Sequence, residues 1–382
     1  MDQKLRIGII GGGQLGMMLL QEADKTNAHY TTLEAVTDCP ANLFTDDLIV
    51  GSLNSDASIR ELAAVSDVIT WEIEHINVDT LIDLESTGKV VIPNPTILKM
   101  IQDKGAQKSF FQEHHIPTSP FDLIDSKDIQ SLNFEKYPQD KIVVKTRTGG
   151  YDGKGVSICS KSELMGGQVP FEGPILIEQF VEDVLELAVI VAVDQKGNHV
   201  AYPSIEMYFN PSSNLVEFLF SPANIDANIE DRAKEIAEKV IVAFKTPGLF
   251  AVELFLTKSG EILVNEIAPR PHNSGHHTIE GCETSQFAQL DRILHGKELG
   301  STKLKQPSAM INLVGPEQLV GKYQLANEAH WQSQNDVFIH MYGKSESRPN
   351  RKLGHVTVVA ESFEKLLERA EYVKENMKVI PS

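Results

Sequence analysis

The chain has 382 residues, of which 53 are acidic and 35 basic, for a net charge of −18. This length suits two or three domains with cores of their own, and the charge argues against sequence-independent binding of nucleic acid or of anionic membranes. Cys39, Cys159 and Cys282 lack the spacing of a disulfide framework or a zinc site, and no stretch approaches 18 apolar residues, so we expect a cytoplasmic protein without a membrane partner.

The first hundred residues alternate between strand-like and helix-like patterns. An apolar run, Leu5–Ile10, precedes a glycine-rich loop and a helical stretch. Further strand patterns follow at 29–33, 47–50, 67–70 and 90–92, with helical patterns at 58–66 and 79–86 between them. Such alternation favours a doubly wound parallel sheet. We therefore predict a Rossmann-like domain over residues 1–100.

The first glycine-rich loop, Gly11-x-Gly13-x-x-Gly16, matches the dinucleotide fingerprint, and Glu34 follows at the end of the next predicted strand. Taken alone, this pattern suggests NAD. The geometry itself is less specific than that, because a close backbone approach and a helix N-terminus suit any phosphate. The loop therefore predicts the fold better than it predicts the ligand.

An acidic segment, Trp71–His75, follows the strand predicted at 67–70 and includes Glu72. It lies at the carboxyl end of a strand, where open α/β sheets bind their ligands. A ligand-binding role and a solvated acidic loop are equally good interpretations of it.

After residue 96 the pattern changes to a long helix, Ile97–His115, followed by strands at 141–146, 174–180, 186–193 and 198–205 and a helix at 230–244. Strands outnumber helices, which favours an α+β domain over residues 101–304. The last residues carry strand patterns at 309–314, 337–342 and 354–359 and a helix at 363–374. They predict a small β-rich domain over 305–382, so the fold class is α/β and α+β.

The second glycine-rich loop, Lys145–Val156, joins two predicted strands and holds four glycines, two lysines and an arginine. A plain hairpin turn needs fewer glycines and cations, so a flap over phosphates is the better interpretation. Lys145 ends an apolar run and needs an anionic partner. Downstream, Glu178, the backbone through Val181, and Glu186 can hold an adenine and a ribose, although ordinary strand-edge residues would give the same pattern.

Two strand patterns, Ala251–Leu256 and Glu261–Ile267, flank a Lys-Ser-Gly turn and predict a hairpin. If Ser259 and Gly260 form a two-residue loop, Glu253 lies directly opposite Glu266. Like charges so placed are destabilising, and Mg²⁺ bound by one or two carboxylates and by substrate phosphates would relieve the repulsion. Two solvated glutamates on an exposed face are the alternative.

The segment after the hairpin, Ala268–Thr278, contains prolines, a glycine, an arginine and three histidines. It predicts a loop beside the two glutamates, with Arg270 able to bind a carboxylate or phosphate through two hydrogen bonds. Three histidines also suggest zinc. We rank zinc below magnesium, because no HExxH spacing is present.

These motifs resemble those of the ATP-grasp enzymes and, within them, the carboxyaminoimidazole ribonucleotide synthases of purine biosynthesis. The resemblance rests on segments 11–16, 72–75, 145–155, 252–255, 265–277, 284–287 and 351–355, of which the Asn265–His276 run is the most specific. It implies a Rossmann-like domain, an ATP-grasp domain and a small C-terminal domain. It also implies that ATP and bicarbonate give carboxyphosphate, which carboxylates aminoimidazole ribonucleotide, and that the protein is a homodimer.

The resemblance assigns site residues by position. The metal ligands for Mg²⁺ are Glu253 and Glu266, and the catalytic residues are Asp152, Arg270, His272 and Lys352, with Asp152 and His272 both candidates to deprotonate the amine. ATP is expected at Lys104, Lys145, Gly150, Tyr151, Asp152, Gly153, Lys154, Gly155, Val156, Glu178, Gln179, Phe180, Val181, Glu186, Asn265 and Glu266. The ribonucleotide or bicarbonate is expected at Gln14, Leu15, Glu72, Tyr151, Arg270, His272, Asn273, Ser274, Arg351 and Lys352.

Three other interpretations remain open at this point. A sibling ATP-grasp ligase would use another amine, such as glycinamide ribonucleotide with formate. An NAD-dependent oxidoreductase would use the first glycine-rich loop, but it leaves the hairpin glutamates without a role. A nucleotide-binding regulator without activity would not need the cations and carboxylates that this chain retains.

Overall fold

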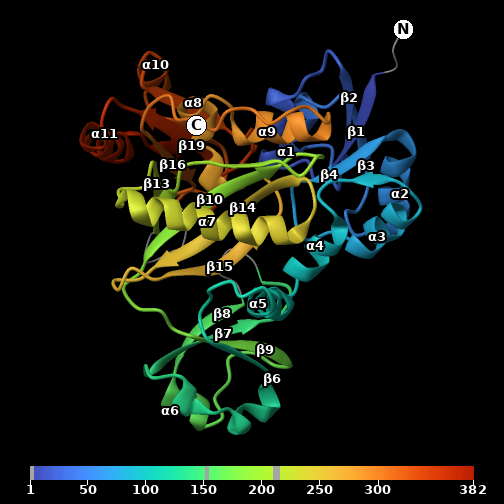
Figure 1. Cartoon of the computed structure of the whole chain (residues 1–382). Helices are drawn as coiled ribbons and strands as arrows, with labels where there is room; N and C mark the ends of the chain where they lie inside the picture. Colours follow the sequence, from blue (N-terminus) through green and yellow to red (C-terminus); the bar gives the residue numbers. More distant parts are fainter. Residues whose placement is uncertain (1–3, 151–154, 210–215) are drawn as a thin grey trace.

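The computed structural model describes residues 4–150, 155–209 and 216–382. In Figure 1 the N-terminal sheet lies to one side of a large central sheet, the C-terminal residues lie at its far end, and a small lobe projects below. No helix among the described residues is long and apolar enough to cross a membrane.

The N-terminal part is the predicted doubly wound sheet. Its strands are parallel and run in the order β3-β2-β1-β4-β5. Helices cover both faces, so that Ile7, Ile9 and Ile10 of β1 are fully buried. The elements are β1 (Leu5–Ile10), α1 (Gln14–Glu22), β2 (Ala28–Glu34), β3 (Asp47–Val50), α2 (Asp56–Val65), β4 (Val68–Trp71), α3 (Val78–Ser86) and β5 (Val90–Val91).

The single helix predicted at 97–115 is wrong, because two helices occupy this segment: α4 (Pro95–Ile101) and α5 (Lys104–Glu113). Asp103 separates them. Its side chain accepts hydrogen bonds from the backbone N–H groups of Gly105 and Ala106, which makes it the N-cap of α5. A helical periodicity does not show such a restart.

The projecting lobe is an antiparallel sheet in the order β6-β9-β7-β8. Ile142, Val144, Ile175 and Ile177 form its core and are fully buried. Its elements are β6 (Phe121–Asp125), β7 (Lys141–Thr146), β8 (Val156–Ser160), α6 (Lys161–Met165) and β9 (Pro174–Gln179). The strand β6 has no counterpart in the predicted elements.

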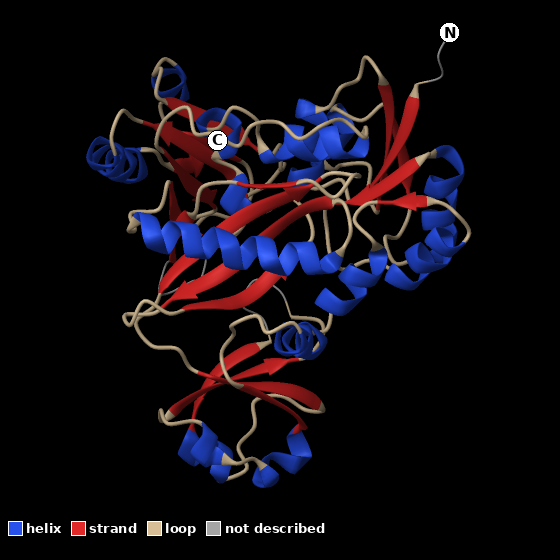
Figure 2. Cartoon of the chain, in the orientation of Figure 1, coloured by secondary structure: helices blue, strands red, loops and turns tan. Residues whose placement is uncertain are grey.

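The central sheet follows the path β15-β14-β10-β12-β13-β16-β19-β18, with β11 beside β10. The helix α7 (Ala227–Phe244) crosses one face of it, as Figure 2 shows. The strand predicted at 198–205 is instead two strands, since Pro203 lacks the N–H that a ladder needs. The strands are β10 (Leu185–Val193), β11 (His199–Ala201), β12 (Ile205–Phe209), β13 (Val216–Ser221), β14 (Gly248–Leu256), β15 (Ile262–Ala268), β16 (Ser308–Val314), β18 (Val337–Met341) and β19 (Lys352–Val359).

The C-terminal strands continue this sheet, because β16 pairs with β13 on one side and with β19 on the other. The predicted domain limits at 100 and 304 stay a prediction. The remaining elements are α8 (Thr278–Gly281), α9 (Gln286–Leu294), β17 (Tyr323–Leu325), α10 (Glu328–Gln332), α11 (Phe363–Asn376) and β20 (Val379–Pro381).

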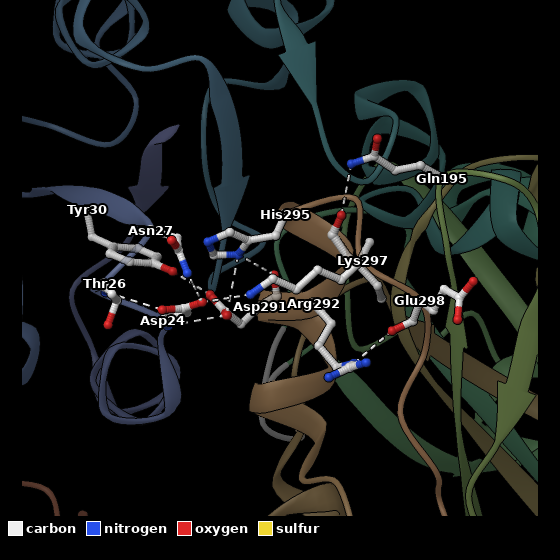
Figure 3. A network of polar contacts seen from close by, with 11 residues as sticks. Asp24, Thr26, Asn27, Tyr30, Gln195, Asp291, Arg292, His295, Lys297 and Glu298 are labelled. Carbon is white, nitrogen blue, oxygen red and sulfur yellow. Dashed lines mark hydrogen bonds and ion pairs between the residues drawn. The ribbon is translucent and has the colours of Figure 1, made fainter. Parts of the chain in front are cut away.

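A polar network, buried at Tyr30 and Asp291 and exposed at Lys297, joins the N-terminal sheet to α9 (Figure 3). Asp291 accepts a 2.5 Å hydrogen bond from the hydroxyl of Tyr30 and a 3.3 Å bond from the backbone of Asp24. His295 lies 3.4 Å from the same carboxylate, and Lys297 pairs with Asp24 at 2.7 Å. The network fixes the N-terminal sheet against the central part of the chain.

We expect Tyr30→Phe to lower the melting temperature, because it leaves a carboxylate oxygen of Asp291 buried with one hydrogen bond fewer, a loss of about 1–3 kcal/mol. The control is Tyr372→Phe on α11, where the side chain is exposed. Thermal melts that show equal stability for both variants would contradict a structural role for the Tyr30–Asp291 bond.

Candidate active site

The β14–β15 hairpin brings Glu253 and Glu266 together by a different route from the one predicted. The two-residue loop is wrong: Leu256 pairs with Ile262, and Thr257 donates to the carbonyl of Glu261, which leaves a three-residue loop ending at Gly260, whose φ is +80°. A loop with one more residue shifts the register by one position.

A β-bulge cancels this shift. Val252 pairs with Ile267 and Leu254 pairs with Val264, so Glu253 on β14 faces two residues of β15, Asn265 and Glu266. Bulges commonly redirect a side chain next to an active site. The facing carboxylates therefore result from an odd loop and a compensating bulge.

Three glutamates share this part of the sheet, since Glu186 on β10 lies close to the hairpin. Burial and the charges of Glu266 and Glu186 raise the pKa of Glu253, and burial and Glu266 raise the pKa of Glu186 to about 7. Burial also opposes ionisation of Glu266, but Lys104 and Lys145 outweigh it and lower its pKa. The described residues supply too little positive charge for all three carboxylates, which is the electrostatic condition for binding a cation.

The donor set suits Mg²⁺ better than a transition metal. Among the described residues no three His, Cys, Asp or Glu side chains form a ready metal centre, whereas Mg²⁺ needs only one or two carboxylates together with phosphate oxygens and water. Glu253 and Glu266 fit that requirement. Lys104, which donates to Glu266 at 2.8 Å, holds one of the two carboxylates in place.

Two lysines bind Glu178 of the predicted ATP site: Lys145, which was predicted, and Lys108, which was not. Lys145, which was expected to need an anionic partner, contacts one oxygen of Glu178 at 2.5 Å, and Lys108 contacts the other at 2.5 Å. Lys145 also lies 3.5 Å from the side-chain oxygen of Asn265 on the hairpin. The lobe sheet and the central sheet therefore meet at these cations.

The second glycine-rich loop begins beside the same lysines. Arg147 forms an ion pair with Asp103 at the start of α5. The backbone carbonyl of Arg147 accepts a 2.8 Å hydrogen bond from the backbone N–H of Lys104. Gly150 ends the described part before the gap, and Gly155 resumes it with a φ of +78°. The predicted site residues Tyr151, Asp152, Gly153 and Lys154 lie outside the described residues.

The other residues predicted to bind ATP extend along the lobe. Val156 begins β8, while Gln179 ends β9 and donates through its backbone to the carbonyl of Pro120. The ammonium of Lys141 lies over the ring of Phe180, 5.3 Å from the centre of that ring. Val181 follows without belonging to a strand. Their predicted roles remain predictions.

The loop after β15 carries several polar atoms without a partner. Arg270 forms a 2.8 Å ion pair with Glu74 of the N-terminal part, while its Nε is buried and unbonded. Both polar atoms of the Asn273 side chain are likewise buried without a hydrogen bond in the described structure. Such groups are costly unless a ligand completes them.

His272 lies between this loop and the hairpin. Its Nε2 is 3.6 Å from Glu253, and its Nδ1 is 2.9 Å from the hydroxyl of Ser274. Burial, Arg270 and Lys352 lower the pKa of His272 to about 3, so the ring is neutral. Ser274 is fully buried and orients this ring, whereas its predicted contact with substrate stays a prediction.

The first glycine-rich loop is occupied by carboxylates. The backbone N–H of Gly12 donates to Glu34 at 2.8 Å, and that of Gly13 donates to Glu72 at 2.7 Å. A side chain at Gly11, where φ is +101°, would collide with Glu72. Glu34 therefore caps the loop, which weakens its interpretation as the ribose ligand of an NAD site.

A cleft of about 810 Å³ lies between the first glycine-rich loop, the Arg270 loop and the C-terminal strands. Six residues predicted to bind substrate line it: Gln14, Leu15, Glu72, Arg270, Arg351 and Lys352. Sequence reasoning missed Lys344 and Arg348, which also line it. The signal was available, because residues 344–352 contain four basic side chains in an otherwise acidic chain.

Positive charge dominates this cleft, with five cationic side chains against Asp38 and Glu72. Lys344 reaches into it, with its ammonium 2.6 Å from the carbonyl of Lys352 and 3.3 Å from the side-chain oxygen of Gln14. Burial and the neighbouring charges of Arg351 and Lys352 lower the pKa of Lys344 to about 8. The cleft therefore suits an anionic ligand.

Comparisons with protein families divide the chain into three matched segments. Residues 4–102 match the ribonucleotide synthetase preATP-grasp domain, residues 109–287 the ATP-grasp domain, and residues 308–369 the phosphoribosylaminoimidazole carboxylase C-terminal domain.

Relatives and solved structures agree with these matches. The phosphoribosylaminoimidazole carboxylase of Vigna aconitifolia, a chloroplastic protein, is 37% identical over 94% of this chain, which spans 64% of that longer protein. The crystal structure of N5-carboxyaminoimidazole ribonucleotide synthetase from Thermotoga maritima is 40% identical and superimposes with a TM-score of 0.89, covering 99% of this chain and 100% of that one.

A second similar structure was solved with ligands. It is the N5-carboxyaminoimidazole synthase of Aspergillus clavatus in complex with ADP and 5-aminoimidazole ribonucleotide, with 29% identity, a TM-score of 0.84, and coverage of 98% of this chain and 100% of that one. With 40% identity to the Thermotoga protein over nearly the full length of both, and with the paired carboxylates and cationic cleft in place, this chain belongs to the N5-carboxyaminoimidazole ribonucleotide synthase family of ATP-grasp enzymes.

Proposed function

We propose that this protein carboxylates 5-aminoimidazole ribonucleotide in an ATP- and Mg²⁺-dependent reaction with bicarbonate. The products are N5-carboxyaminoimidazole ribonucleotide, ADP and phosphate. The observation that carries the proposal is the position of the cationic cleft, which shares Arg270 with the loop that follows the paired carboxylates of the hairpin. One ligand with a phosphate and a second with a metal-bound triphosphate can therefore meet at this loop.

The ATP side of the site rests on Lys104, Lys145 and the hairpin. Phosphoryl transfer depends mainly on positioning and on charge stabilisation, and these two lysines lie beside Glu266 and Asn265. Mg²⁺, held by Glu253 and Glu266, would offset negative charge on the phosphate oxygens. Glu186 adds a third carboxylate close to this position, and burial together with the charge of Glu266 raises its pKa.

The ribonucleotide side rests on the cleft. Its sugar phosphate would bind among Lys344, Arg351 and Lys352, which supply local positive charge in a protein with a net charge of −18. Bicarbonate and the carboxyphosphate made from it would bind at Arg270 and Asn273, whose buried polar atoms lack partners in the described structure. A guanidinium and an amide suit these oxygen-rich ions.

The proton that leaves the substrate amine has two candidate acceptors, Asp152 and His272. The pKa of His272 is lowered to about 3, and its Nδ1 contacts Ser274. A base this weak holds a proton poorly at neutral pH, which favours a hydrogen-bonding role for His272. Asp152, which lies outside the described residues, remains the other candidate.

Two further expectations remain predictions. The protein is expected to be a homodimer and to act in the cytoplasm, although the chloroplastic relative shows that proteins of this kind are not confined to one compartment. Size measurement in solution tests the first expectation.

The direct test of the proposed function is ADP release by the purified protein with ATP and Mg²⁺. We expect ADP formation to require bicarbonate and to be stimulated by 5-aminoimidazole ribonucleotide, with the carboxylated product identified by mass spectrometry. Stimulation by glycinamide ribonucleotide and formate instead would favour a sibling ligase. No ADP formation with any amine, together with tight binding of a nicotinamide nucleotide, would overturn the proposal in favour of an oxidoreductase.

The metal assignment is tested by Glu266→Gln, which keeps the size of the side chain and removes its charge. We expect turnover to be lost while the melting temperature stays close to that of the wild type, because Glu266 is half-exposed and its role is to bind the ligand. Glu261→Gln, an exposed change on the same hairpin, is the control and should leave activity unchanged. A fully active Glu266→Gln variant would refute the assignment.

The phosphate role of Lys344 predicts a pH dependence. A lysine with a pKa lowered to about 8 loses its charge as the pH rises through that value, so kcat/KM for the ribonucleotide should fall above this pH, since that ratio reports the free enzyme. Lys344→Met should lower kcat/KM at pH 7 and remove this alkaline limb. An unchanged alkaline limb in the variant would show that another group causes it.

A further inference from the structure

Lys108 on α5 is a buried cation for which the proposed reaction has no role. Its side chain is 3% exposed, and that of its partner Glu178 is 4% exposed. The ammonium lies 2.5 Å from Glu178, 2.6 Å from the hydroxyl of Thr118 and 3.1 Å from that of Ser119. A lysine has three hydrogens to donate, so Lys108 has none left for a ligand.

Lys145 differs from Lys108 although it binds the same carboxylate. It contacts the second oxygen of Glu178 at 2.5 Å and is 13% exposed, and among the described residues its one further contact is a long one, 3.5 Å from Asn265. Lys145 therefore retains donors for a phosphate. Lys108 thus uses all its hydrogen-bond donors within the protein, whereas Lys145 has donors available for a ligand.

Ligand binding creates a problem that this arrangement solves. A phosphate beside Lys145 competes with Glu178 for the same ammonium, and a carboxylate buried as deeply as Glu178 cannot be left without a cation. Lys108 supplies this cation to Glu178 whether or not a phosphate is bound at Lys145. Ser119 supports it by donating to the same oxygen of Glu178 at 2.9 Å.

We propose that Lys108 is a positioning residue of the ATP site: it neutralises Glu178 and thereby leaves Lys145 available to the phosphates. The inference rests on the proposed function, since it requires ATP phosphates at Lys145. It predicts that Lys108 acts on ATP affinity only through Glu178 and without touching the nucleotide.

The test measures the Kd of ATP with Mg²⁺ by calorimetry on the full chain. Lys108→Met leaves Lys145 as the only cation bonded to Glu178 among the described residues, so we expect the Kd to rise by at least about tenfold, the scale of one charge-assisted hydrogen bond. Glu178 is itself predicted to bind ATP, so the double variant Lys108→Met with Glu178→Gln is compared with Glu178→Gln alone. If Lys108 acts only through Glu178, the two Kd values should agree within about threefold. Lys99→Met, which removes an exposed lysine of α4, is the matched control and should leave the Kd unchanged.

The outcomes separate the alternatives. A wild-type Kd in Lys108→Met overturns the inference. A double variant that binds ATP more than about threefold more weakly than Glu178→Gln alone overturns it too, because Lys108 would then act on ATP by a route other than Glu178. If Lys108→Met fails to fold, the double variant, which buries no unpaired carboxylate, decides alone by the same criterion. Wild-type protein that binds ATP but forms no carboxylated product would refute the proposed function and leave this inference standing, whereas failure to bind ATP overturns both.

Discussion

The repulsion among three partly buried glutamates of the central sheet is the constraint on which the rest of the site depends. The charges of Glu266 and Glu186 raise the pKa of Glu253, and the charge of Glu266 raises the pKa of Glu186. Lys104 and Lys145 compensate only part of that charge. The described residues therefore leave a deficit of positive charge at one end of the hairpin, and this deficit is what supports the proposal of a phosphate-bound cation there.

The second half of the site shows the opposite imbalance. The cleft between the first glycine-rich loop and the C-terminal strands has a surplus of cations, and the chain around it is strongly acidic. Arg270 belongs to both regions, because it lines the cleft, pairs with Glu74 of the N-terminal part and follows the hairpin directly. The N-terminal sheet must hold its position for this pairing to exist, and the Tyr30–Asp291 contact at α9 helps to fix that position.

Sequence reasoning recovered the elements whose periodicity is strong and missed the features that depend on local hydrogen bonds. The parallel N-terminal sheet follows from its alternating pattern. The break at Asp103, the bulge opposite Glu253 and the three-residue loop do not, because each is set by one backbone or side-chain bond. Glu253 and Glu266 were predicted to face each other from a loop of the wrong length. The three-residue loop shifts the strand register by one position and the bulge shifts it back, so the two residues still face each other. Lys108 was missed because nothing in a helical pattern indicates which lysine a distant glutamate will bind.

The first glycine-rich loop shows why a motif predicts a backbone more reliably than a ligand. Its glycines allow the chain to turn closely, and the exposed N–H groups attract anions whatever their source. Here two of those groups bind Glu34 and Glu72, which are anions of the protein itself. Because Glu72 is held by Gly13 and also lines the cleft, the loop serves to place a carboxylate opposite the cations of the C-terminal strands. A backbone geometry that suits phosphate thus orients one side chain at the edge of the cationic cleft.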